Sequence, residues 1–163
     1  MMDSSIPPVS SAIEQLDTDS NLFMGLVGGG VAMLVGAAIW GAVTYFTEYQ
    51  IAWMAIGVGF LVGFAVRLLG KGHAAIFGIS SAVLSLIGCL LGNFLFYMGV
   101  IAREQNASFL EVLFFFIVTP GALIELFTLA FDFMDLLFYG LAAYVGFKTA
   151  LDVPQTGQPQ VRS

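Results

Sequence analysis

The chain has 163 residues, of which 59% are hydrophobic and only 10% charged, and its formal net charge is −6 at pH 7. An ordinary soluble domain has about 25% charged residues, so this composition is typical of a membrane protein, and the length leaves room for one helical bundle. The five Lys and Arg residues are scattered along the chain, which argues against nucleic acid as a partner. The single cysteine excludes an intramolecular disulfide.

The N-terminal part of the chain consists of a polar tail and one long apolar run. Residues 1–20 are acidic, contain no Lys or Arg and include two adjacent prolines. A secretory signal would begin with basic residues, so we expect this stretch to be a disordered acidic cytoplasmic tail. Residues 22–47 carry no charge, and crossing a hydrocarbon core about 30 Å thick requires roughly 20 apolar residues of helix. This range is therefore the first predicted span.

Two further apolar runs follow, separated by short polar breaks. A turn over 48–50 precedes the second predicted span, 51–69, and the glycines around Lys71 end it. The third predicted span covers 74–101 and ends just before four polar residues, 103–106. Each run is long enough to cross the membrane as a helix.

The segment 108–130 differs from these runs because it is apolar but interrupted. Ser108 and Glu111 have the spacing of a capping box, which starts a helix. Thr-Pro-Gly at 119–121 then breaks the run. Each half is too short to cross the membrane, so we favour an interfacial or re-entrant helical hairpin over a complete extra span.

The last apolar run, 132–150, is the fourth predicted span, and the polar residues 151–163 are expected to form a disordered C-terminal tail. The fold class predicted is an all-α membrane protein: a four-transmembrane-helix bundle over residues 21–150, with the hairpin before the last span. Small residues four apart recur in every span and allow close helix approach. They are Gly25/Gly29, Ala37/Gly41, Ala55/Gly59/Gly63, Gly88/Gly92 and Ala142/Gly146.

The basic residues set the expected direction of the chain. Arg67, Lys71 and Lys148 are predicted to anchor the inner face, and Arg103 falls at the opposite face. Because cytoplasmic loops carry an excess of Lys and Arg, we expect the N-terminus and the C-terminus in the cytoplasm. Four aromatic residues are interpreted as a belt at the outer interface. They are Trp40, Tyr45, Tyr49 and Trp53.

A polar stripe runs along the third predicted span. Its members recur at every fourth position and so share one helical face; they are Ser81, Ser85, Cys89, Asn93 and Tyr97. Asn93 is the costliest to bury, because its amide needs several hydrogen-bond partners, and we expect it to face the bundle interior. Since the stripe has no carboxylate and no basic residue, we favour hydrogen bonding between helices over a polar path for water or a small solute.

Three carboxylates form a candidate outer acidic cluster: Glu125, Asp132 and Asp135. They would lie near one face if a helix ran continuously through this region, and an ionisable residue inside a membrane is a candidate functional site. Asp132 and Asp135, however, lie where the fourth predicted span begins. Carboxylates stabilise a helix N-terminus there and are solvated at headgroup depth, so we favour capping over a cation or proton site.

The sequence contains no complete motif of a catalytic or cofactor site. Gly78-Ile79-Ser80-Ser81 is close to the G-x-S-G of intramembrane serine proteases, but it lacks the second glycine and a histidine on a later span. His73 is the only histidine and has no cysteine nearby with which to bind a metal. We therefore expect no enzyme activity, no cofactor and no metal.

Two stretches carry a resemblance: YQIAWMAIGVGFLVGFAVRLLGKG at 49–72 and FDFMDLLFYG at 131–140. They resemble small, uncharacterised bacterial four-span inner-membrane proteins, and the likeness extends over most of residues 45–150. The resemblance implies a location in the bacterial inner membrane. It brings no known activity or ligand, so no functional residue is carried over.

Two functions remain open at this point. The first is a non-catalytic scaffold or accessory subunit, held in the lipid bilayer and assembled through small-residue helix contacts with another copy or with a membrane protein partner. The alternative is a small channel or transporter for an ion or small solute. In that case the polar stripe would be the path and the acidic cluster its outer mouth.

Overall fold

The computed structural model describes residues 20–47, 52–72, 74–130 and 132–151. Within these ranges the chain forms six α-helices and no β-strand, which confirms the all-α prediction for this part of the chain. The helices are α2 (Leu22–Thr47), α3 (Ala52–Gly70), α4 (Ala75–Glu104), α5 (Phe109–Val118), α6 (Pro120–Ala130) and α7 (Phe133–Leu151). The predicted tails at 1–19 and 152–163, the turn over 48–50 and His73 lie outside the described residues.

The helix ends follow local sequence signals. The expected break at 119–121 is present, because α5 ends at Val118 and Pro120 is the first residue of α6. Proline suits the first helical position, where no N–H donor is needed. The capping box also forms: the Ser108 hydroxyl accepts a hydrogen bond from the Glu111 N–H at 3.2 Å, and the Glu111 carboxylate accepts one from the Ser108 N–H at 2.8 Å.

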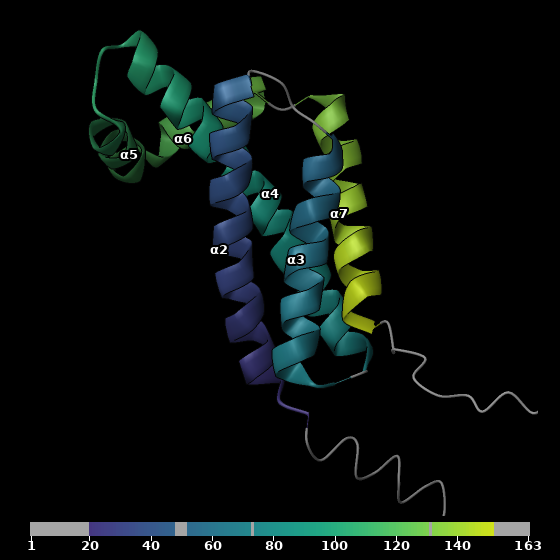
Figure 1. Cartoon of the computed structure of the whole chain (residues 1–163). Coiled ribbons are helices and arrows are strands. Elements are labelled where there is room, and N and C mark those ends of the chain that lie inside the picture. Colours follow the sequence, from purple (N-terminus) through teal and green to yellow (C-terminus); the bar gives the residue numbers. More distant parts are fainter. Residues whose placement is uncertain (1–19, 48–51, 73, 131, 152–163) are drawn as a thin grey trace, which may run out of the picture.

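Four helices lie side by side as a bundle (Figure 1). Helices α3 and α4 contact each other, α2 contacts both of them, and α7 contacts both as well. Successive members of the bundle run in opposite directions, so the described chain ends at Ser20 and Leu151 lie at the same end (Figure 1). Helices α5 and α6 lie crosswise beside the other end, where α5 contacts the last turns of α4.

Three of the described helices are long and apolar enough to cross a membrane. They are α2, α3 from Trp53, and α4. The α5–α6 pair is bent by 103° and makes a fourth only if it is counted as one broken span. Helix α7 is not among the three; Asp135 in its first turn and Lys148 in its last turn make it less apolar. The chain therefore has three to four candidate membrane spans, as a multi-pass membrane protein would.

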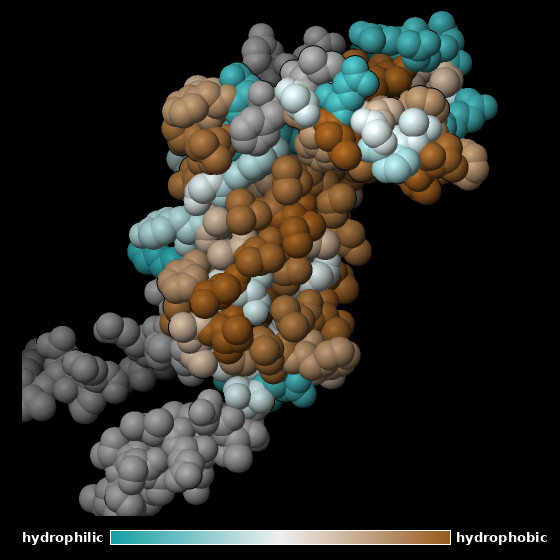
Figure 2. All heavy atoms as spheres, turned by 180° about the vertical axis from the view of Figure 1, so that it is seen from behind, coloured by the Kyte–Doolittle hydropathy of each residue, from teal (hydrophilic) through white to brown (hydrophobic). Residues whose placement is uncertain are grey.

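The surface of the bundle agrees with this assignment. In Figure 2, hydrophobic residues cover the middle of the bundle, and hydrophilic residues gather mostly at its two ends and along the tip of the α5–α6 region. Large apolar side chains such as Leu34 and Phe60 are more than half exposed there. An exposed apolar surface of this extent is unfavourable in water, whereas in a bilayer it is surrounded by hydrocarbon chains.

Glycines bring the backbones of α3 and α7 into close contact. A Cβ atom built on Gly63 would lie 2.7 Å from the Gly146 carbonyl oxygen, and one built on Gly59 would overlap the Ala142 carbonyl. No side chain larger than a hydrogen atom fits at either position without moving α7. Because lipid tails are as apolar as leucine, such close backbone contact is a main source of attraction between helices in a bilayer.

The α5–α6 region is attached to α4 through a separate apolar cluster. Met98 and Ala102 of α4 pack with Val112 and Phe116 of α5. The ring of Phe94 on α4 meets the Phe116 ring edge-on at 5.8 Å and stacks on the Phe127 ring of α6 at 6.1 Å, measured between ring centroids. This region therefore rests on one helix of the bundle and leaves its outer side exposed.

Candidate functional site

Four buried side chains from three helices meet in what we call the polar centre: Trp40 of α2, Asn93 of α4, and Asp135 and Tyr139 of α7. Each is at most 7% exposed. The centre lies close to the beginning of α7, the end of the bundle that carries α5 and α6 (Figure 1). The prediction that Asn93 faces the bundle interior is confirmed.

The Asn93 amide connects the three helices. Its oxygen Oδ1 accepts a hydrogen bond from the Trp40 indole N–H at 2.8 Å. Its nitrogen Nδ2 donates to Asp135 Oδ1 at 3.0 Å and to the Tyr139 hydroxyl oxygen at 2.8 Å. The amide has two N–H donors, and both are therefore used. Gly92 makes this arrangement fit, because a Cβ there would lie 2.7 Å from the Trp40 side chain.

Asp135 has a second role at the start of α7. Its other oxygen, Oδ2, accepts a hydrogen bond from the backbone N–H of Asp132 at 3.1 Å, and the Asp132 carboxylate accepts one from the Phe133 N–H at 2.7 Å. These bonds satisfy N–H groups that a helix N-terminus leaves without intrahelical partners. The expectation that Asp135 is solvated is wrong, since it is only 2% exposed. The donors to its carboxylate, an amide and a backbone N–H, carry no charge.

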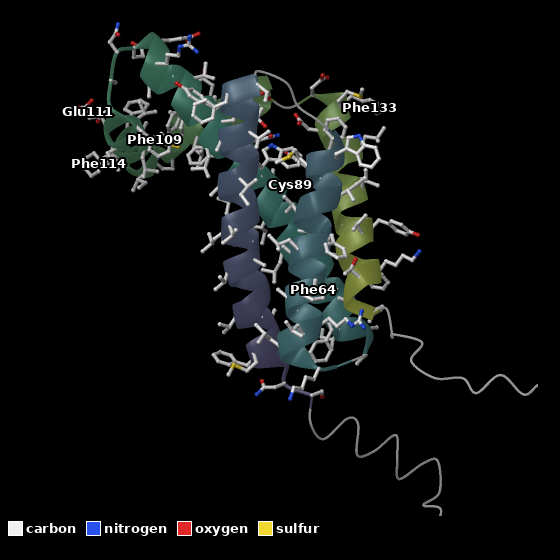
Figure 3. All side chains as sticks on the ribbon, viewed as in Figure 1. Phe64, Cys89, Phe109, Glu111, Phe114 and Phe133 are labelled. Atoms are coloured by element: carbon white, nitrogen blue, oxygen red, sulfur yellow. The ribbon has the colours of Figure 1, made fainter. Side chains whose placement is uncertain are left out.

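The first three residues of the polar stripe in chain order also face the bundle interior. Ser81 and Ser85 are fully buried, and so is Cys89, which lies among the helices of the bundle (Figure 3). The Ser81 hydroxyl donates to the Gly146 carbonyl oxygen on α7 at 2.9 Å, whereas the Ser85 hydroxyl donates to the Ser81 carbonyl oxygen of its own helix at 2.8 Å. Tyr97, the last residue of the stripe in chain order, is half-buried.

The candidate acidic cluster does not come together as a metal-binding group. Glu125 and Asp132 are exposed while Asp135 is buried. Among the described residues, no group of three His, Cys, Asp or Glu side chains could hold a metal ion. Of the candidate anchors, Arg67 is half-buried, and Lys71 and Lys148 are exposed.

Trp40 and Tyr139 are the functional candidates that the sequence analysis missed. Trp40 was assigned to an outer aromatic belt, and that assignment is wrong because the side chain is 0% exposed and belongs to the polar centre. Of the other proposed belt members, Trp53 is 77% exposed, Tyr45 is half-buried, and Tyr49 lies outside the described residues. The available signal was helical spacing, since Asp135 and Tyr139 are four residues apart and so share a face of α7.

The interior hydrogen bonding is complete in this part of the chain. No buried side-chain nitrogen or oxygen among the described residues lacks a hydrogen-bond partner. A buried polar group without a partner is costly, so the polar centre and the stripe stabilise one arrangement of α2, α4 and α7. No family model, curated protein or solved structure matches the chain.

Proposed function

We propose that the chain is a non-catalytic scaffold or accessory subunit of the bacterial inner membrane, which assembles with a second copy or with another membrane protein. The observation that carries this proposal is the complete internal use of the interior polar groups. An ion or solute path needs polar atoms that exchange partners with the passing species. Here the Asn93 amide and the Ser81 hydroxyl are bonded between helices instead.

The proposed topology has four spans, α2, α3, α4 and α7, with both termini in the cytoplasm. Helix α7 is included because it contacts both α3 and α4 along the bundle and its charges lie in its terminal turns. Lys71 and the last turn of α7 lie at the same end of the bundle, and Arg103 lies at the other (Figure 1). This distribution agrees with the excess of basic residues that cytoplasmic faces carry.

The proposed topology is tested by labelling cysteines from outside the cell, in a Cys89→Ser background. Arg103→Cys is expected to react with an impermeant maleimide in intact cells. Lys71→Cys is expected to react only after permeabilisation. The reverse pattern would overturn the orientation, and labelling of both positions in intact cells would overturn the four-span arrangement.

The surface that we propose for assembly is the outer side of α5 and α6. Leu110 and Phe114 on α5 are 72% and 66% exposed, and Ile124 on α6 is 69% exposed. Phe114 lies on the side of α5 that points away from the bundle, and Phe109 lies nearer the bundle (Figure 3). Because α5 and α6 rest on α4 alone, this surface is displaced sideways, where another membrane protein can reach it.

Photocrosslinking in native membranes tests this assembly. A photoreactive residue at Leu110 or Phe114 is expected to give a discrete protein adduct, whose mass identifies a second copy or a different protein. Phe60 on α3 is the control, because it is apolar and 55% exposed on the bundle itself. Adducts only with lipid at all three positions would contradict the proposal.

A small channel or transporter is the second candidate, and one observation favours it. Asp135 is a buried carboxylate whose hydrogen-bond donors are uncharged, and ionisable residues inside membrane bundles often mark ion or proton pathways. Flux measurements in proteoliposomes separate the two functions. The scaffold predicts no ion or proton flux above protein-free vesicles. A flux that Asp135→Asn abolishes would establish the second candidate.

A further inference from the structure

The polar centre and the α5–α6 region are attached to the same turn of α4. Asn93 and Phe94 are neighbours in that helix, and successive residues of an α-helix point about 100° apart. The Asn93 amide is bonded to α2 and α7 inside the bundle, whereas the Phe94 ring contacts rings of α5 and α6. A rotation or shift of this turn therefore moves the side chains of both contacts together.

The chain makes a second connection at the beginning of α7. Helix α6 ends at Ala130 and α7 begins at Phe133, and the two residues between them extend over at most about 7 Å. The backbone N–H of Asp132 donates a hydrogen bond to one oxygen of the Asp135 carboxylate, and Asn93 donates to the other oxygen. A displacement of α6 therefore changes the position of a hydrogen-bond partner of Asp135.

These two places are where movement of the region can reach the bundle. Among the described helices, α5 and α6 have close backbone contact only with each other and, through α5, with α4. We propose that the α5–α6 region and the polar centre are energetically coupled, so that displacement of the region weakens the hydrogen bonds of Asn93 with Trp40 and Asp135. A displacement caused by a bound partner rests on the proposed function, whereas the coupling itself is a property of the chain alone.

The polar centre responds to small movements because of how it is built. The three bonds of the Asn93 amide are between 2.8 and 3.0 Å long, and hydrogen bonds weaken steeply when they depart from their preferred geometry. Its members are at most 7% exposed, so water does not replace a lost partner at low cost. A partner that moves α5 and α6 therefore changes how firmly α2 and α7 are held to α4.

The test follows the Trp40 indole hydrogen in the purified full chain by NMR, as its rate of exchange with deuterium. Phe127→Ala removes a ring of α6 that stacks on Phe94 and does not belong to the polar centre. We expect exchange at Trp40 to become about two to five times faster, the upper value being the factor that the energy of one ring pair corresponds to. The chain has two tryptophans, and the resonance of Trp53, which is 77% exposed, is expected to stay in place.

Two further variants control for the truncation of a ring. Phe114→Ala removes an exposed ring of α5 and is expected to leave exchange at Trp40 unchanged. Phe127→Leu keeps an apolar side chain and loses only the ring, so an intermediate increase is expected, and this variant replaces Phe127→Ala if the latter does not fold. Thermal unfolding in detergent verifies that each variant is folded.

The reverse experiment perturbs the polar centre and measures the α5–α6 region. Coupling between two sites is reciprocal, so Asn93→Leu is expected to increase backbone hydrogen exchange in 109–130 by a similar factor. Ser81→Ala is the control, because it removes a bond between α4 and α7 at Gly146, away from the centre. This variant is expected to leave exchange in 109–130 unchanged.

Three results would overturn the coupling. The first is equal exchange at Trp40 in Phe127→Ala and Phe114→Ala, and the second is unchanged exchange of 109–130 in Asn93→Leu. The third is a shifted Trp53 resonance together with faster exchange at Trp40, because it would indicate general loosening of the bundle. The absence of protein adducts at α5 contradicts the scaffold proposal and leaves the coupling intact, since these measurements use the chain alone.

Discussion

Two helix contacts in this molecule are built in opposite ways. Helices α3 and α7 meet backbone to backbone at Gly59 and Gly63, where no side chain fits between them. Helix α4 holds α5 and α6 through large side chains, with Phe94 between Phe116 and Phe127. The first contact is sensitive to any added atom, whereas the second can lose side-chain atoms and stay in place. The two contacts therefore differ in which mutations disturb them.

The largest expected effect is at the glycine contact. Gly63→Leu places atoms where the Gly146 carbonyl oxygen and Thr149 lie, and we expect a loss of about 3 kcal/mol or more in the free energy of unfolding, as for severe overpacking of a core. Gly57→Leu on the same helix is the matched control, because a Cβ there meets nothing within 4 Å. Steric-trapping or denaturant unfolding in micelles measures both. Equal losses would show that the contact does not limit packing.

The next effect is expected in the polar centre. Asn93→Leu removes three hydrogen bonds between helices and leaves Asp135 and the Trp40 indole N–H without their amide partner. At about 0.6 kcal/mol for each bond in a membrane, we expect a loss of about 2 kcal/mol in the same unfolding assay. Gln105→Leu, at an exposed position with an ordinary backbone conformation, is the control. If the two variants were equally stable, the centre would not hold the helices together.

A smaller and more local effect is expected at the aromatic contact. Phe94→Ala removes two ring pairs, each contributing about 1 kcal/mol, and should loosen α5 and α6 while the bundle remains folded. Hydrogen exchange is expected to rise in 109–130 and to stay unchanged in α3. Phe114→Ala, which truncates an exposed ring on α5, serves as the control. Faster exchange throughout the bundle would refute a separate attachment.

The smallest effects distinguish the two buried serines. Ser81→Ala removes a hydrogen bond to Gly146 on α7, and we expect a loss of about 0.6 kcal/mol. Ser85→Ala removes a bond within α4 itself and is expected to change stability less. A larger loss for Ser85→Ala would mean that the stripe contributes through packing rather than through hydrogen bonds to α7.

The sequence predicted the helices well because their signals are local. Capping at Ser108 and Glu111, the break before Pro120 and the uncharged run over 22–47 depend on neighbouring residues only. The inward direction of Asn93 could also be predicted, since burial in lipid is costly for an amide. These features need no knowledge of which helix lies next to which.

The polar centre could not be predicted, because it depends on contacts across 53 and 42 positions of chain. Trp40 pairs with Asn93 over the first separation, and Asn93 pairs with Asp135 over the second. Tryptophan near the end of a span usually indicates the membrane interface, and here Gly92 lets it lie inside instead. The neighbour that changes the environment of Trp40 lies on another helix.

Helix lengths in the bundle differ, and this has a consequence for the lipid around it. Helices α3 and α7 have 19 residues each and α4 has 30, which correspond to about 28 Å and about 45 Å. Only the shorter length matches a hydrocarbon core of about 30 Å. An untilted α4 would therefore extend beyond the hydrocarbon core, and tilt of a long helix is one way in which a bilayer accommodates it.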